Sequence, residues 1–138
     1  MKRFFLIGCA FLFLGCSSRV SVDDLNKLNG YWEITRVTFA DGNTKEYKVN
    51  TSVDYIKVED RKGFRKKVHP KLNGTFETSD DAETFTVVEE GKGLSIRYKT
   101  ELSEWSELLT ELDDDVFSVV NPEGIRYDYK RFEPISIQ

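Results

Sequence analysis

Five basic side chains lie within seven positions of an otherwise acidic chain: Arg61, Lys62, Arg65, Lys66 and Lys67. Such a cluster can bind a phosphate, a lipid head group or an acidic partner. It can also be a solvated loop and edge strand, where lysine prevents edge-to-edge pairing, and we favour this interpretation. In a strand, Arg65 and Lys67 would share one face and Lys66 would point to the other. Both faces then carry charge, which predicts an edge or a rim, with Arg65 and Lys67 as candidates for binding an anion.

The chain has one residue that could act as a catalytic histidine. His69 is the only histidine, and it stands beside Pro70 in a predicted loop, where a solvated side chain is the more frequent role. The clustered carboxylates fall at predicted turns: Asp80-Asp81, Glu89-Glu90 and Asp113–Asp115. General acid–base catalysis needs a buried carboxyl, and a calcium loop needs alternating oxygen ligands with a central glycine. We therefore expect no enzyme, no metal site and no cofactor.

The first fifteen residues have the pattern of a secretory leader. Lys2 and Arg3 give a positive start, and residues 4–14 form an apolar run too short for a membrane-spanning anchor. The run ends in Phe13-Leu14-Gly15-Cys16, which resembles a bacterial lipobox. At such a signal a lipid such as palmitate is attached to the cysteine, and the chain is cut just before it.

Two alternatives to lipidation at Cys16 remain. A second match, ending in Cys9, leaves almost no apolar run ahead of it. An ordinary cleaved signal would prefer an Ala-x-Ala-like site. We therefore predict a leader over residues 1–15, a lipidated tether over 16–24 and a domain over 25–133.

The inferred mature chain is acidic and has a single cysteine. Removing the leader leaves 123 of the 138 residues and changes the formal net charge from −4 to −6, because the leader carries two basic residues and no acidic one. One cysteine permits no disulfide within the chain and no cysteine-based metal site. The negative charge disfavours nucleic acid and a broad anionic membrane surface as partners. The expected membrane contact is the N-terminal lipid.

Beyond Gly30 the chain has the pattern of an antiparallel β protein. Short runs rich in aromatic and β-branched residues alternate with turns that contain glycine. The expected strands cover residues 31–39, 44–49, 53–59, 64–68, 74–77, 84–89, 94–100, 116–121 and 125–132. Before them, residues 22–28 can form one or two helical turns, with Val22, Leu25 and Leu28 on one face. This spacing predicts an all-β barrel or sandwich, with the helical turn covering one end.

One segment, residues 101–112, fits two kinds of structure. Its large apolar residues recur at helical spacing, which by itself indicates an amphipathic helix: Leu102, Trp105, Leu108, Leu109 and Leu112. Residues 105–108 also alternate, and the sheet needs a partner strand between 94–100 and 116–121. We therefore predict a strand.

The segment Gly30-Tyr31-Trp32 resembles the Gly-x-Trp motif that opens the first barrel strand of the lipocalins. Lipocalins also have a basic residue near the end of the barrel that packs across this tryptophan, and Arg131 is the candidate. With the lipobox, the chain resembles a lipocalin-like lipoprotein of the Bacteroidota type, although it is shorter and lacks the disulfide and the Thr-Asp-x-x-Tyr motif. The resemblance implies a lipocalin-like (calycin) up-and-down antiparallel β-barrel of about eight strands, closed at one end by Gly30, Trp32 and Arg131.

The resemblance also implies a small hydrophobic or amphipathic ligand, held without catalysis. Aromatic residues on the expected strands could line a cavity or could fill it as a core: Phe39, Tyr55, Phe76, Phe85, Tyr98 and Phe117. Arg65 or Lys67 would then bind the head group of a ligand such as a fatty acid. The alternative is a packed barrel that serves as a structural or protein-interaction module of the envelope.

The same resemblance bears on location. The residues after Cys16, Ser17-Ser18-Arg19-Val20, lack the early acidic pair that some Bacteroidota lipoproteins carry as a surface-export signal. We therefore expect a monomeric cell-envelope protein, anchored in the outer membrane and facing the periplasm.

Overall fold

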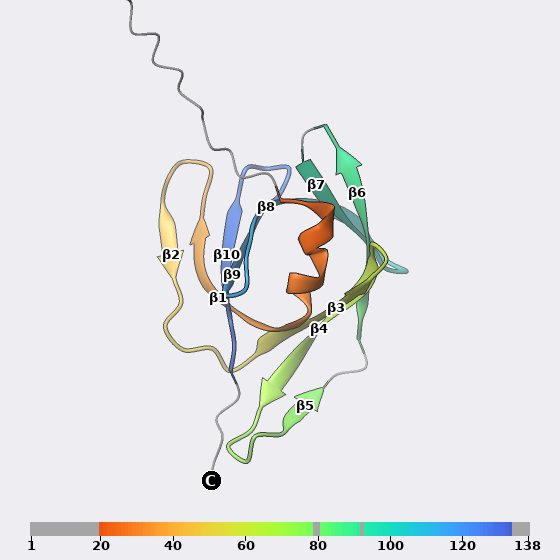
Figure 1. Ribbon diagram of the computed structural model, residues 1–138. Helices are drawn as coiled ribbons and strands as arrows, with labels where there is room; N and C mark the ends of the chain where they lie inside the picture. The colour runs from red at the N-terminus through yellow and green to blue at the C-terminus, as the bar shows by residue number, and fades with distance from the viewer. Residues whose placement is uncertain (1–19, 79–80, 92, 134–138) are drawn as a thin grey trace, which may run out of the picture.

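The computed structural model describes residues 20–78, 81–91 and 93–133, so Cys16 and the leader lie outside the described residues. This part of the chain contains one short 3-10 helix and ten strands (Figure 1). The elements are η1 (Val22–Leu28), β1 (Gly30–Thr38), β2 (Thr44–Glu46), β3 (Val53–Glu59), β4 (Lys62–Pro70), β5 (Phe76–Thr78), β6 (Glu83–Glu90), β7 (Gly93–Lys99), β8 (Glu104–Leu112), β9 (Val116–Val120) and β10 (Arg126–Arg131). Within the described ranges, no helix is both long enough and apolar enough to cross a membrane.

Eight of the strands close into an antiparallel barrel. Neighbouring strands follow the order β1-β3-β4-β6-β7-β8-β9-β10, and β10 pairs with β1 to complete the ring. The two short strands lie outside this ring: β2 pairs with the end of β1, and β5 pairs with the end of β4. The predicted all-β, lipocalin-like up-and-down barrel of about eight strands with a short N-terminal helix is confirmed. The helix begins at Val22, inside the segment predicted as tether.

The hairpin between β3 and β4 is tighter than the sequence indicated. Asp60 and Arg61 form the turn, and both have positive φ angles, 52° and 65°, although neither is glycine. Gly63, expected in the turn, lies within β4 opposite Val58. A Cβ at this position would lie 2.7 Å from the ring of Phe85, so the glycine makes room for a core side chain.

Strand β8 covers the segment whose apolar spacing also fitted a helix, and the strand prediction is confirmed. A β-bulge interrupts its pairing with β9 between Leu109 and Glu111. The bulge shifts the alternation by one residue, so Leu109 and Leu112 both pack toward the core although they are three positions apart. Leu102 lies in the preceding loop and is 98% exposed.

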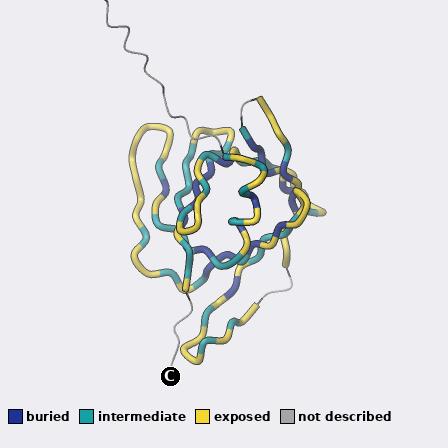
Figure 2. Tube along the Cα trace, in the orientation of Figure 1, coloured by how far each residue is buried: buried dark blue, intermediate teal, exposed yellow. Residues whose placement is uncertain are grey.

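A continuous apolar core fills one end of the barrel. Figure 1 looks along the barrel and shows η1 inside the ring of strands, and Figure 2 shows buried segments on the surrounding strands. The core includes side chains from the helix and from most strands of the ring: Leu25, Leu28, Trp32, Ile56, Val58, Phe85, Val87, Leu94, Ile96, Leu109, Phe117 and Val119. We call the end that carries η1 and Trp32 the closed end. The opposite end, which carries Lys67, Glu83 and Trp105, is the open end.

Candidate functional site

Alternation along the strands places charged side chains inside the barrel, above the apolar core. On β8 the inward positions run from Leu109 near the closed end through Glu107 to Trp105 at the open end. On β4 the inward position after Gly63 is Arg65. The side chains inside the barrel therefore change from apolar to charged at the level where the apolar core ends.

An open cavity of about 510 Å³ occupies the open end above this level. Part of its wall is apolar or aromatic: Ile34, Tyr98, Trp105, Tyr127 and Tyr129. The other lining side chains are charged: Asp54, Arg65, Lys66, Lys67, Asp81, Glu83 and Glu107. A cavity of this volume can hold one small organic molecule.

Arg65 is a buried cation of this cavity, with its side chain 11% exposed. Its Nη2 donates to Asp54 Oδ2 and to Tyr129 Oη, both at 2.8 Å, and its Nη1 donates to Tyr98 Oη at 3.3 Å. The guanidinium carbon lies 5.0 Å from the centroid of the Tyr129 ring. A carboxylate thus neutralises the buried charge while two phenols fix its orientation.

The two phenols around Arg65 stay neutral at physiological pH. Burial raises the pKa of Tyr98 to about 12, although Arg65 acts in the opposite direction. Burial likewise raises the pKa of Tyr129 above its ordinary value. Each phenol oxygen accepts a hydrogen bond from Arg65, which leaves its O–H hydrogen to donate toward a bound molecule.

The hydrogen-bonding capacity of the Glu107 carboxyl is less well satisfied than that of the Arg65 guanidinium. Its Oε2 is buried and has no hydrogen-bond partner among the described residues. Burial raises the pKa of Glu107; Arg65 opposes this shift, whereas Glu83 and Asp54 add to it. A buried carboxyl oxygen without a partner costs stability, and a ligand that supplies a hydrogen-bond donor would remove that cost.

Of the aromatic residues predicted to line a cavity, Tyr98 is the one that does so in the described structure. Phe85 and Phe117 are buried in the core, with 4% and 1% of their surface exposed. These two residues fill the barrel, which is the alternative that the sequence left open for them.

Tyr55, Phe76 and Phe39 lie outside the barrel interior, contrary to the prediction that they line it. The inward position next to Tyr55 on β3 is taken by Ile56, so Tyr55 faces outward. Phe76 on β5 stacks against Tyr31, with ring centroids 4.3 Å apart. Phe39 follows β1 and is 42% exposed. Whether a strand residue faces inward or outward depends on its place in the alternation along the strand. The type of residue alone does not reveal this.

The basic cluster does not form one anion-binding patch. Arg61 lies in the turn at the closed end, whereas Lys67 is 70% exposed at the open end, 3.7 Å from Asp54. Arg65, predicted at a rim together with Lys67, instead lies inside the barrel. The predicted rim position is therefore found for Lys67 but not for Arg65.

Trp32 and Arg131 lie in contact at the closed end. Trp32 is fully buried, and its Nε1 donates to the carbonyl oxygen of Leu28 at 2.9 Å. The guanidinium carbon of Arg131 lies 4.2 Å from the centroid of the indole, and its nitrogens donate to three backbone carbonyl oxygens. Gly30 has a φ of +129°, and a Cβ there would lie 2.5 Å from Arg131 Nη1. The glycine permits the approach that closes the barrel.

A closed eight-stranded ring with this tryptophan–arginine contact agrees with the sequence family that the chain matches. Residues 28–119, more than half of the chain, match the family model described as a lipocalin-like domain. The chain belongs to the lipocalin-like domain family. A comparison with curated proteins found no match.

Several solved structures are similar to this lipocalin-like chain. A lipocalin-like protein from Bacteroides uniformis is 13% identical with a TM-score of 0.48, and the match covers 77% of this chain and 99% of that one. An uncharacterized protein from Bacteroides eggerthii is 14% identical with a TM-score of 0.48, covering 76% and 99%. Apocrustacyanin C1 is 12% identical with a TM-score of 0.49, covering 84% and 67%. At such low identity these similarities do not indicate a function, and the family assignment rests on the sequence match.

The histidine and the acidic triplet Asp113–Asp115 make local structural contacts in the lipocalin-like domain. His69 lies on β4 and not in the predicted loop; it is exposed, with Nδ1 3.2 Å from the carbonyl oxygen of Thr51. Asp113 accepts hydrogen bonds from the backbone N–H groups of Asp115 and Val116, both at 2.8 Å, and these bonds lower the pKa of Asp113. In the described part of the chain, no three His, Cys, Asp or Glu side chains are grouped to hold a metal ion.

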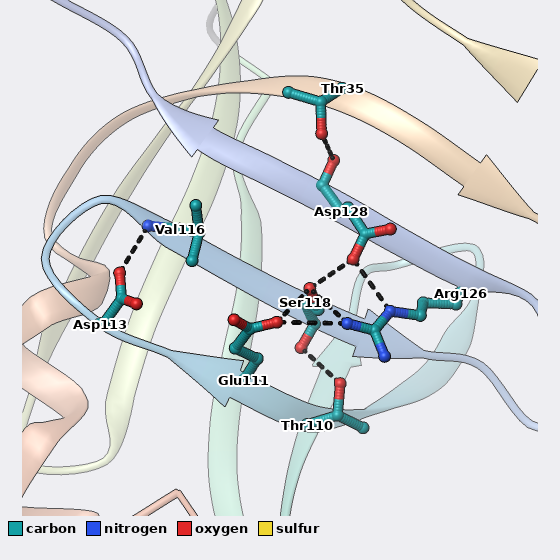
Figure 3. A network of polar contacts seen from close by, with 8 residues as sticks. All are labelled: Thr35, Thr110, Glu111, Asp113, Val116, Ser118, Arg126 and Asp128. Atoms are coloured by element: carbon teal, nitrogen blue, oxygen red, sulfur yellow. Dashed lines mark hydrogen bonds and ion pairs between the residues drawn. The ribbon is translucent and has the colours of Figure 1, made fainter.

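A polar network on the outer face of β8, β9 and β10 was not foreseen from the sequence (Figure 3). The Ser118 hydroxyl is buried and donates to Asp128 Oδ1 at 2.5 Å. Arg126 donates from Nε to Asp128 at 2.9 Å and from Nη2 to Glu111 at 3.2 Å. The network joins three strands and includes no histidine to act as a general base for Ser118. We interpret it as a structural feature of the lipocalin-like domain.

Proposed function

We propose that this lipocalin-like domain binds one compact amphipathic molecule at its open end and does not catalyse a reaction. The observation that carries the proposal is the cavity of about 510 Å³, in which an aromatic wall stands above a buried charged layer. A concave site that combines aromatic side chains with directed polar groups is typical of small-molecule sites. Membership of the lipocalin-like family supports the proposal, since eight-stranded barrels of this kind can hold a small ligand.

The filled closed half of the barrel limits the length of the ligand. Ile56, Phe85 and Ile96 are buried in the core at 3–4% exposure. A long fatty-acid tail among Phe76, Phe85 and Tyr98, as the sequence suggested, has no room, because Phe76 lies outside and Phe85 belongs to the core. The apolar part of the ligand would instead lie against the aromatic wall around Trp105. This geometry favours a compact ring over an extended chain.

The proposal includes location at the cell envelope. The leader, residues 1–15, would direct export, and Cys16 would carry the lipid that holds the domain at the periplasmic face of the outer membrane. Val20 lines a surface pocket together with Gly93 and Leu94 at the start of β7, which belongs to the closed end. The tether would therefore leave from the closed end, and the cavity would open away from the membrane.

Native mass spectrometry of the full chain, purified from membranes of the cells that express it, tests the ligand proposal. We expect a population heavier by one small molecule. Trp105→Ala should lose this adduct because it removes the cavity wall, whereas Tyr55→Ala, on the outer face, should keep it. An unliganded wild-type protein, or an adduct retained equally by Trp105→Ala, would contradict the proposal.

Lipid attachment is tested by labelling with palmitate and membrane fractionation. Cys16→Ser should lose the label and release the domain from membranes, and Cys9→Ser should remain labelled and anchored. The reverse pattern would move the lipidation site to Cys9. Loss in neither variant would exclude a lipoprotein anchored at either cysteine.

The outer face favours a second candidate function, docking to another envelope component. Tyr31 contacts both Tyr55 and Phe76, with centroids 4.9 and 4.3 Å apart, and Phe132 lies 6.4 Å from Phe76. All four rings are half-buried, so part of this cluster remains accessible. Crosslinking in intact cells through a photoreactive side chain at Tyr55 tests this function. A specific crosslinked partner that is absent when the photoreactive side chain is placed at Glu104 instead would support docking over ligand binding.

A further inference from the structure

We infer that the ligand of the open-end cavity is a compact amine that presents its protonated nitrogen to Glu107. This inference rests on the proposed binding function and specifies the class of molecule for the same site. It starts from the unpartnered Oε2 of Glu107, which is buried among the described residues. The Glu107 side chain lines the cavity, and a protonated amine there supplies both a hydrogen-bond donor and a compensating charge to its carboxyl group.

The cations of the cavity are already engaged, unlike Glu107. Arg65 bonds to Asp54 and to two phenol oxygens, and Lys67 lies 3.7 Å from the same aspartate. Lys66 lies 5.8 Å from the centroid of an outer-face ring, that of Phe64. An acidic ligand would bring a second negative charge beside the Glu107 carboxyl, which has a buried oxygen without a described partner. An amine leaves the contacts intact and pairs the carboxyl.

The aromatic wall suits the same class of ligand. Trp105 and Glu107 occupy successive inward positions of β8, so the indole and the carboxyl are presented together. Trp105 stacks on Tyr98 with centroids 5.1 Å apart and an interplanar angle of 9°, and both line the cavity. Aromatic rings attract cations through their faces and accommodate a flat apolar body. The site therefore combines an ion pair with an aromatic surface.

The inference predicts a defined pH dependence of binding. The charged and titratable groups around Glu107 come from five strands: Asp54 (β3), Arg65 (β4), Glu83 (β6), Tyr98 (β7) and Tyr129 (β10). Burial raises the pKa of Glu107, so part of the free protein carries a neutral carboxyl above the ordinary pKa. An amine binds the ionised form and displaces the proton. Its affinity should rise with pH until Glu107 is ionised in the free protein.

Calorimetric titration of the full chain with three probes of matched shape tests the inference. The probes are 3-phenylpropylamine, 3-phenyl-1-propanol and 3-phenylpropanoate, which differ mainly in the charge of the head group. At pH 8 the amine should bind at least about tenfold more tightly than the other two, the effect expected for one charge-assisted hydrogen bond. Its affinity should fall as the pH is lowered toward 5.

Variants on one strand provide the control. Glu107→Gln should abolish both the preference for the amine and its pH dependence, while Glu111→Gln, on the outer face of β8, should keep both. Equal or tighter binding of the propanoate or the alcohol, or a pH-independent affinity for the amine in the wild-type protein, overturns the inference and leaves the binding function standing. Binding of none of the three probes overturns the inference as well. If native mass spectrometry then also shows no adduct, the proposed function falls too.

Discussion

The two ends of the barrel each place an arginine against an aromatic ring, and they satisfy it differently. At the closed end Arg131 lies 4.2 Å from the centroid of the buried Trp32 indole and donates to backbone carbonyl oxygens. At the open end Arg65 lies 5.0 Å from the Tyr129 centroid and is paired with a carboxylate, and Glu107 nearby keeps an oxygen without a described partner. Native interiors rarely leave such an oxygen without a reason. The difference separates side chains that stabilise the barrel from side chains that remain available to a ligand.

The largest expected effect distinguishes the two tryptophans. Trp32→Ala should lower the free energy of unfolding by about 3–5 kcal/mol, because it leaves a cavity in the closed end. Trp105→Ala should cost at most about 2 kcal/mol, because this ring is half-buried at the open end. Urea denaturation measures both values. Equal costs would remove the distinction between a structural end and a binding end.

A double-mutant cycle sharpens the description of the closed end. Arg131→Ala should cost about 1–3 kcal/mol through the lost cation–π contact and hydrogen bonds. Combined with Trp32→Ala, it should cost less than the two single effects added, because the residues touch. The control pair is Trp32→Ala with Arg126→Ala on the outer face, which should be additive. Additivity in both pairs would mean that Arg131 does not stabilise the tryptophan.

The closed end was predictable from sequence, and the open end was only partly so. Gly30 and Trp32 stand two positions apart in a recognisable motif, and Arg131 stands at the end of the last strand, so three positions defined the closure. At the open end, the face taken by Tyr55 depends on the alternation of β3, and a shift of one residue reverses it. No spacing pattern in the sequence encodes that choice.

Glu107 was missed for a related reason. The residue lies in the segment that also fitted an amphipathic helix, where it would belong to the polar face. Its inward position becomes evident from the pairing of Glu107 with Ile96, a core residue of β7. Arg65 was noticed as a basic residue but was expected at a rim, because Lys66 places charge on the other face of the same strand.

The carboxyl of Glu107 should oppose folding at neutral pH. Burial raises its pKa above the ordinary value of 4.5, so the folded state binds more protons than the unfolded state. Stability should therefore fall as the pH rises from about this value through the raised pKa, and should stay lower above it. Glu107→Gln should increase the free energy of unfolding at pH 8 by about 1–3 kcal/mol and should remove this pH dependence.

Chemical denaturation between pH 4 and pH 9 measures the effect of Glu107, with Glu111→Gln as the control on the opposite face of β8. A Glu107→Gln variant that is less stable than the wild-type protein at pH 8 would show that the carboxyl has a partner in solution. In that case the open end would have no unpartnered carboxyl oxygen for a ligand.

The smallest expected effect concerns the turn between β8 and β9 at the closed end. Asp113→Ala removes an acceptor for two backbone N–H groups and should cost less than about 1 kcal/mol, because the turn is exposed. These bonds lower the pKa of Asp113, so their contribution is present above its ordinary pKa and is lost as the pH falls through the lowered value. Asp114→Ala keeps Asp113 and, scanned alongside by thermal denaturation, should retain the pH dependence that Asp113→Ala loses. Equal behaviour of the two variants would contradict the role given to Asp113.

The central claim is that a compact amine binds at the open end and leaves the closed end unchanged. The protein has two tryptophans, Trp105 in the cavity wall and Trp32 in the closed end, so their indole N–H resonances report on the two ends separately. Addition of 3-phenylpropylamine to the ¹⁵N-labelled full chain should shift the Trp105 indole signal in a saturable manner and leave the Trp32 signal in place. A saturable shift of Trp32 alone, or no shift of either signal at millimolar amine, would contradict the claim.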